Sequence, residues 1–317
     1  MTEEARLAQL QANGITIEYE TIGAENGEPL LLIMGLGAQM TRWPDGLVHQ
    51  LVRHGFRVVR FDNRDAGLST HFKDAGVPDA REVVKAMAEG RKPEVPYTLD
   101  DMAADAVAVL DGLGVQRAHI VGASMGGMIA QLVVADYPER VLSFTSIFSS
   151  TGNPELPPAT PEALSVITTP APHPSDQEAF VAHSIKNARI TGSPAYPADE
   201  AYLRERAIAD AARAYNPAGV GRQYAAVIAN GDRRPKLAKI TAPTVVLHGA
   251  DDPLVPVTGG RDTAANIPGA ELRVIPGMGH DLPPQLYDKI VDAIIAARDR
   301  ARAVQAAGGA EGGASAA

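Results

Sequence analysis

Near the middle of the chain stands the stretch HIVGASMGGMIAQ, residues 119–131. It begins with apolar residues, continues as a G-x-S-x-G turn centred on Ser124, and ends in a run with helical spacing. A strand that turns sharply into a helix strains its central residue, and a side chain at Gly122 or Gly126 would collide across the turn. The stretch therefore predicts a strand, a tight turn and a helix, with Ser124 exposed at the carboxyl edge of a sheet.

Apolar runs of the same kind recur on both sides of this stretch. They lie at residues 30–34, 58–61, 144–148, 244–247 and 272–275. Continuous apolar runs predict strands buried on both faces. In residues 15–22 apolar and polar residues alternate, which predicts a strand at a sheet edge with one solvent-exposed face. Segments with helical spacing, notably 99–113 and 128–137, lie between the runs. This alternation predicts an α/β fold with a mostly parallel sheet covered by helices on both faces.

One region interrupts the rhythm of strand and helix. Residues 151–234 contain no apolar strand run, are rich in proline, and show helical spacing at about 177–191 and 198–214. We expect a helical cap or lid inserted between two strands of the sheet. A surface excursion without a role in substrate choice is the alternative.

The rest of the chain divides around this insertion. Residues 1–150 and 235–303 are expected to form the core, ending in a helix over roughly 285–303. Residues 304–317 are mostly alanine and glycine, a composition typical of a disordered tail.

Two later loops carry the groups that a serine nucleophile needs. Serine attacks only when a neighbouring base takes its proton, and the base needs an acid to hold its tautomer. Asp251 and Asp252 directly follow the run at 244–247, and His280 follows the next run. Because the carboxyl ends of parallel strands share one edge of a sheet, these residues are expected to meet Ser124 there.

With this order of serine, acid and histidine, the sequence resembles the α/β-hydrolase superfamily over nearly its whole length, the cap and tail excepted. The resemblance implies a doubly wound, eight-stranded α/β-hydrolase sheet. In the family the acid commonly stands three residues beyond the glycine of a strand-end H-G pair, which here is Asp252. Asp251 is the competitor, and one of the two is expected to cap the following helix.

The resemblance also implies an oxyanion hole. Met34-Gly35-Leu36-Gly37 stands where the family commonly has H-G-x-G. The donor is a backbone N–H, so the change of His to Met should not abolish the hole, and the implied donors are Leu36 and Met125.

A further motif, D-N-R-D-A-G-L-S-T at residues 62–70, resembles the family's D-x-R-G-x-G-x-S, with Asp65 where glycine is commoner. We interpret Asp62 and Arg64 as structural residues whose ion pairing fixes the loops beside the site. Together with M-G-L-G-A-Q and G-A-S-M-G-G, the motif looks most like small-molecule carboxylesterases, including methyl esterases that act on polyketides.

Composition narrows the remaining function classes. The net charge of −9 disfavours binding to nucleic acid or to anionic membranes. The chain has no cysteine, which excludes a thiolate nucleophile and a disulfide. Metal and nucleotide motifs are absent, so no cofactor is expected. The N-terminus lacks the pattern of a secretory signal and no apolar run approaches about 20 residues, so we expect a cytoplasmic protein without a membrane anchor.

The sequence thus predicts a serine hydrolase that cleaves a carboxylic ester of a small molecule through an acyl-enzyme, and carries no indication of an oligomeric state. The alternatives on the same triad are cofactor-free perhydrolysis or haloperoxidation and hydrolysis of a C–C bond. A non-catalytic receptor on a hydrolase scaffold is a third alternative.

Overall fold

The computed structural model of the protein describes residues 5–314, and the exposure of side chains as far as residue 307. Eight strands of the described range form one sheet in the order β1-β2-β4-β3-β5-β6-β7-β8. The strands are β1 (Arg6–Ala12), β2 (Ile15–Ile22), β3 (Glu28–Ile33), β4 (Phe56–Phe61), β5 (Ala118–Ala123), β6 (Val141–Ile147), β7 (Thr244–Gly249) and β8 (Glu271–Ile275). Strands β1 and β2 run antiparallel to their neighbours, and the other pairs are parallel.

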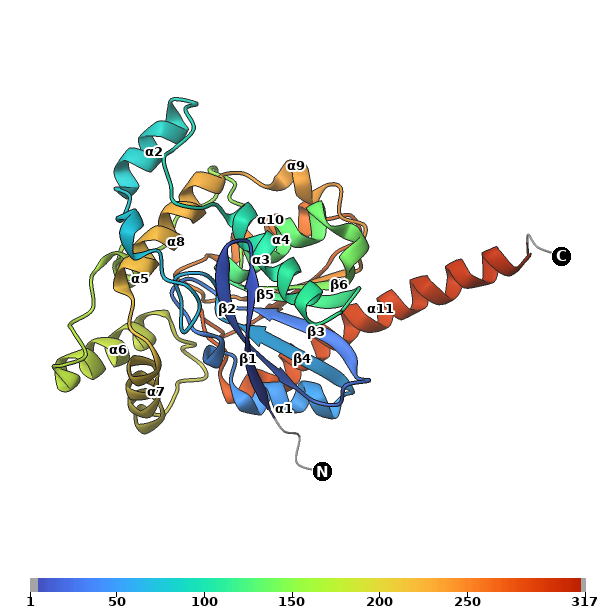
Figure 1. Ribbon diagram of the computed structural model, residues 1–317, viewed down its shortest axis with the longest axis horizontal. Coiled ribbons are helices and arrows are strands. Elements are labelled where there is room, and N and C mark those ends of the chain that lie inside the picture. The colour runs from blue at the N-terminus through green and yellow to red at the C-terminus, as the bar shows by residue number, and fades with distance from the viewer. Residues whose placement is uncertain (1–4, 315–317) are drawn as a thin grey trace.

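Helices cover both faces of this sheet (Figure 1). On one face, Leu31 and Ile33 belong to the core formed with α3 (Leu99–Gly112) and α4 (Met125–Asp136). On the other, Leu30 and Leu32 pack with α1 (Asp45–Arg53) and α11 (Tyr287–Ala314). Successive side chains of a strand point to opposite faces, which is why the unbroken apolar run of β3 serves both cores. The predicted α/β fold with a mostly parallel, doubly wound, eight-stranded sheet is confirmed.

The outer strand at the N-terminal side differs from the sequence-based prediction. We expected residues 15–22 to form the edge, but β1 pairs with β2 over its whole length and is itself the edge strand. Its sequence, RLAQLQA, contains two large apolar side chains, and most of its positions are exposed. The sequence of this segment alone therefore does not indicate a strand. An edge strand needs only one apolar face, which weakens its sequence pattern.

The insertion between β6 and β7 contains more helix than predicted. Besides α6 (Gln177–Thr191) and α7 (Glu200–Arg213), it has α5 (Pro161–Thr168), α8 (Pro217–Asn230) and the short α9 (Arg234–Leu237). The prolines at residues 161 and 217 are the first helical residues, where proline is tolerated because no helical N–H is lost. Helix α8 packs against α2 (Ala80–Ala88) and α3, whereas α6 and α7 pack on each other (Figure 1).

The last helix is longer than expected. We predicted a helix to about residue 303 and disorder over 304–317, but α11 continues to Ala314, and 315–317 lie outside the described residues. The helix extends away from the sheet (Figure 1), although the four glycines at residues 308, 309, 312 and 313 have low helix propensity. No helix of the described chain has both the length and the apolar character needed to cross a bilayer. Helix α10 (Val257–Asn266) completes the layer beside β7 and β8.

Candidate active site

Ser124 lies on the turn between β5 and α4, in a backbone conformation that is rare for a residue with a side chain. Its φ and ψ are 57° and −123°. The turn lies close to other segments of the backbone, which leaves no room for side chains at its two glycines. A Cβ on Gly122 would lie 2.2 Å from the Gly126 carbonyl oxygen, and one on Gly126 would lie 2.0 Å from the carbonyl oxygen of Ile33. The two glycines are therefore required for space, and the strain at Ser124 holds its hydroxyl away from the backbone.

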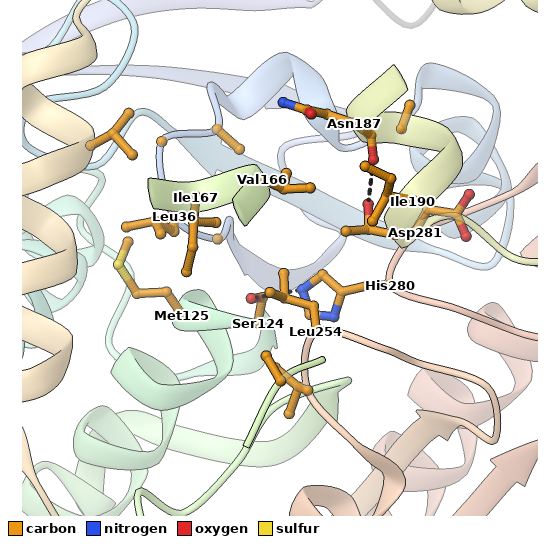
Figure 2. A pocket seen from close by; sticks show the side chains of 18 of the residues that line it. Leu36, Ser124, Met125, Val166, Ile167, Asn187, Ile190, Leu254, His280 and Asp281 are labelled. Atoms are coloured by element: carbon orange, nitrogen blue, oxygen red, sulfur yellow. Dashed lines mark hydrogen bonds between the residues drawn. The ribbon is translucent and has the colours of Figure 1, made fainter. Parts of the chain in front are cut away.

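The structure brings Ser124, His280 and Asp252 together in one chain of hydrogen bonds. The Ser124 hydroxyl donates to Nε2 of His280 over 2.9 Å, and Nδ1 of His280 donates to Oδ2 of Asp252 over 2.7 Å. Figure 2 shows the His280 ring directed at Ser124. The carboxylate fixes the tautomer with the proton on Nδ1, which leaves a lone pair of Nε2 free to accept the serine proton.

The two adjacent aspartates have separate partners. The second oxygen of Asp252, Oδ1, accepts the N–H groups of Leu254 and Val255, each over 2.9 Å, so both oxygens of the carboxylate are engaged. Asp251 instead accepts the N–H of Gly277 over 2.7 Å. We expected one aspartate to cap the next helix, but α10 begins after Pro256 without a side-chain cap. Asp251 joins its loop to the loop that leads to His280.

The insertion holds the loop that carries His280. The backbone N–H of His280 donates to the Thr191 carbonyl over 2.7 Å, and the N–H of Gly279 donates to the hydroxyl of Ser193 over 2.9 Å. That hydroxyl in turn donates to Asp281. Burial raises the pKa of the Asp281 carboxyl. The end of α6 and the residues after it thus fix the position of the imidazole.

The loop after β3 passes next to the serine. A Cβ on Gly35 would lie 3.0 Å from the Cβ of Ser124, a tight contact, so glycine favours this close approach of the loop. In Figure 2 the side chains of Leu36 and Met125 lie on one side of Ser124 and the His280 ring on the other. Met125 is the first residue of α4, and the N–H groups of a helix's first turn have no carbonyl partner within the helix. The geometry leaves Leu36 and Met125 as the candidate oxyanion donors.

Asp62 and Arg64 do not pair with each other. Arg64 forms a two-pronged ion pair with Asp105 of α3, at 2.6 and 2.7 Å. Asp62 lies 2.7 Å from Arg213 of α7 and accepts the N–H of Met40 at the same distance. Each residue therefore lies in an ion pair with a different helix. The chain turns after β4, so the two side chains reach different helices.

A large cavity of about 1490 Å³ opens above the serine. Its walls come from the loops at the carboxyl edge of the sheet and from α5, α6, α7 and α8. Figure 2 shows Val166, Ile167, Asn187, Ile190 and Leu254 around it. The wall is more apolar than polar, and its polar part includes charged side chains such as Arg206, Asp210 and Asp281.

Comparison with known proteins agrees with this architecture. The sequence model of the family described as alpha/beta hydrolase fold matches residues 28–284. The chain belongs to the α/β-hydrolase family.

Similar proteins are named as hydrolases of more than one kind. The rhodomycin D methylesterase DnrP of Streptomyces peucetius is 30% identical over 301 residues, which cover 89% of this chain and 94% of the relative. A hydrolase from Pseudomonas aeruginosa, 27% identical, superimposes with a TM-score of 0.68 over 92% of this chain and 97% of its own. A meta-cleavage product hydrolase from Pseudomonas fluorescens has a TM-score of 0.72 over 93% and 98% of the two chains, but only 17% identity, so it shows the fold alone.

Several residues of this α/β-hydrolase site are not evident from its sequence. Gln223 of α8 accepts the N–H of Gly37 in the loop after β3, and Ser193 accepts the N–H of Gly279 in the loop that carries His280. The Phe148 ring lies 4.5 Å from the His280 ring, measured between centroids. None of these residues belongs to a motif. Each lies far along the chain from the residue that it contacts, so no spacing in the sequence connects them.

Proposed function

We propose that this protein is a serine carboxylesterase that hydrolyses methyl esters of bulky small-molecule acids. The chain is a hydrolase acting on esters, a conclusion that rests on the family model and on the methylesterase relatives. The finer proposal concerns its residues and mechanism. The observation that carries it is the relay of two hydrogen bonds, 2.9 and 2.7 Å long, from Ser124 through His280 to Asp252.

Acylation follows from this relay. The oxygen of Ser124 attacks the ester carbonyl while Nε2 of His280 takes the serine proton, and the carbonyl oxygen becomes an oxyanion facing the N–H groups of Leu36 and Met125. Asp252 stabilises the imidazolium that forms. As the tetrahedral intermediate collapses, the C–O bond to the alcohol breaks and His280 gives its proton to the departing oxygen. Removing one oxyanion-hole donor typically costs about 2.7–4 kcal/mol of transition-state stabilisation.

Deacylation repeats these steps with water as the nucleophile. His280 takes a proton from water, the new C–O bond forms, and Ser124 leaves with the proton returned by His280. The products are the free acid and the alcohol. Apart from the substrate and water, every reacting group belongs to the chain.

Two observations favour a bulky acid over a short one. The cavity of about 1490 Å³ exceeds the roughly 300–1,000 Å³ typical of ligand pockets, so a short acyl group would leave most of it filled by water. DnrP and DauP, 30% and 29% identical to this chain, are named as methylesterases of rhodomycin D. Removing methanol from a large acid requires space on the acyl side of Ser124.

The decisive test is Ser124→Ala. We expect this variant to lose hydrolysis of a p-nitrophenyl ester, and of a methyl ester of a bulky aromatic acid, by at least about a thousand-fold, because its nucleophile is gone. Ser146→Ala is the control, since it removes another buried serine hydroxyl, one without a hydrogen-bond partner. Retained turnover in folded Ser124→Ala protein would refute the mechanism.

The alternatives give different results with the same proteins. A non-catalytic receptor would not be labelled at Ser124 by a fluorophosphonate. In the presence of peroxide, acetate and bromide, a perhydrolase would brominate a dione faster than it cleaves esters, because the peracid it forms oxidises the bromide. A C–C hydrolase would cleave a vinylogous diketone in preference to the methyl ester.

A further inference from the structure

The loop between Gly35 and Ala38 is a β-turn that presents the candidate oxyanion donor. The N–H of Ala38 donates to the Gly35 carbonyl over 3.3 Å. Gly37, the third residue of the turn, has a φ of +65°, as a type II turn requires. The N–H and C=O of a trans peptide point in opposite directions, so the bond to the Gly35 carbonyl also sets the direction of the Leu36 N–H.

A glutamine from the insertion is bonded to this turn. Oε1 of Gln223, in α8, accepts the N–H of Gly37 over 2.7 Å. Its Nε2 donates to the Arg64 carbonyl, also over 2.7 Å. The side chain is fully buried, so both ends of the amide are satisfied by protein backbone alone. Gln223 therefore links the oxyanion loop to the loop after β4.

The bond to Gly37 decides between two forms of the turn. A glycine in the third position tolerates both signs of φ, so the central peptide between Leu36 and Gly37 can rotate between type I and type II at small cost. Rotation would turn the Gly37 N–H away from Gln223 and leave the buried Oε1 without a donor, which is unfavourable. The amide thus selects the type II form.

Helix α8 is itself firmly attached to the core. Arg222, next to Gln223, forms a two-pronged ion pair with Asp65, with both distances 2.7 Å. The Asn216 amide at the start of α8 donates to the Asp65 carbonyl over 3.0 Å. On the turn, a Cβ at Gly37 would lie 2.8 Å from Val220, so the helix also packs directly against the loop. Gln223 therefore lies on a helix that is fixed to the core by several contacts.

We infer that Gln223 is a positioning residue for the oxyanion hole, acting through Gly37 to hold in one conformation the turn that presents the Leu36 N–H. The inference rests on the proposed function, because it assumes that Leu36 stabilises an oxyanion. Oxyanion donors contribute most when they are held in place before the reaction, so a mobile turn should slow chemistry more than it weakens substrate binding.

The test compares two buried glutamines. Gln223→Met removes the bond to Gly37 at nearly constant side-chain length. Gln131→Met is the matched control, because Gln131 is also fully buried and bonded at both ends, to Ser150 and Arg233, with no contact to the oxyanion loop.

We expect Gln223→Met to lower kcat for a p-nitrophenyl ester by about 10–100-fold with KM within about three-fold of wild type. The Ki of a trifluoromethyl ketone, which forms a tetrahedral adduct with serine, should rise in proportion. Gln131→Met should lose thermal stability while kcat stays within about three-fold of wild type.

Two further variants keep the test decisive. If Gln223→Met does not fold, Gln223→Asn replaces it, because the shortened amide cannot reach Gly37 and the same loss of kcat is expected. Gln223→Glu keeps an acceptor for Gly37 and should retain more kcat than either. Unchanged kcat and Ki in folded Gln223→Met, or equal losses in Gln131→Met, would overturn the inference while leaving the serine mechanism intact. Turnover by Ser124→Ala would instead overturn the mechanism itself.

Discussion

Asp251 and Asp252 are adjacent in the chain, but only Asp252 reaches the imidazole. Asp252→Asn preserves size and presents an amide to Nδ1, which favours the wrong tautomer of His280. We expect kcat to fall by about ten-thousand-fold, as for other triads with this change. Asp251→Asn keeps an oxygen acceptor for Gly277, so its kcat should remain within about ten-fold of wild type. Steady-state kinetics of the pair would contradict the assignment if Asp251→Asn proved the more damaging.

Single residues could be predicted where a motif places them after a buried strand. Ser124, His280 and the choice of Asp252 follow from three strand ends, and the structure places these side chains within hydrogen-bond distance. Partners that meet through tertiary packing could not be predicted. Arg64 lies 41 residues from Asp105, and Gln223 lies 186 residues from Gly37, and no spacing rule connects such positions.

At the scale of elements, α6 was predicted to its terminal residues, while α5, α8 and β1 were missed. Helix α6 has an aspartate cap and fifteen residues without proline, so its limits are visible in the sequence. Proline in the first turns of α5 and α8 is also typical of a loop. The start of each helix can be predicted only if Thr160, before α5, and Asn216, before α8, are recognised as caps. The edge strand β1 forms through its pairing with β2, so its own residues do not indicate a strand.

The attachment of α8 gives a prediction about stability. Asp65 has a φ of +66° and accepts hydrogen bonds from Arg222 and from the Tyr97 hydroxyl. Burial opposes ionisation of this carboxyl, but the bonds from Arg222 and Tyr97 outweigh it and hold the pKa of Asp65 below its usual range. Asp65→Gly would relieve the backbone but leave Arg222 buried without its partner, at a cost of about 3–5 kcal/mol.

A double-mutant cycle tests this pair. Arg222→Met should be similarly destabilising, because it leaves a buried carboxylate unpaired, whereas the double variant Asp65→Gly/Arg222→Met should be less destabilised than the sum of the two. Urea unfolding followed by circular dichroism measures all four proteins. Additive losses would mean that the ion pair does not hold α8 to the core.

The strand β5 carries a buried histidine that makes stability depend on pH. Burial lowers the pKa of His119 to about 4, against a partial opposing effect of Glu28. The unfolded chain takes up a proton below about pH 6.5, but the folded chain does so only near pH 4. Folding is therefore weakened as pH falls through this window, by an amount on the order of 3 kcal/mol. His119→Gln should flatten this part of the curve of unfolding free energy against pH. An unchanged slope would show that other groups, such as the buried His248, whose pKa burial also lowers, account for it.

In the whole molecule, the insertion between β6 and β7 contributes to the site from two directions. Thr191 and Ser193 hold the loop of His280, and Gln223 holds the loop of Leu36. The alternative of a surface excursion without a role is hard to reconcile with these contacts, because both loops lie at the edge where Ser124 stands. We infer that the insertion acts as a frame for catalysis as well as a wall of the cavity.

The insertion forms part of the cavity wall, and this leads to a prediction about substrate selectivity. Ile190 of α6 faces the cavity beside Asn187, away from the Leu36 side of Ser124 (Figure 2). Ile190→Trp should fill part of the acyl space and raise KM for a methyl ester of a bulky aromatic acid by about ten-fold or more, since a poorly fitting ring costs about 1–3 kcal/mol. The kcat/KM for p-nitrophenyl acetate should change by less than about three-fold, because its acyl group needs little of that space. Lys186→Trp is the control, since it puts the same ring on the exposed side of α6, outside the cavity lining. Equal effects of Ile190→Trp on both substrates would place the acyl group of the bulky ester elsewhere.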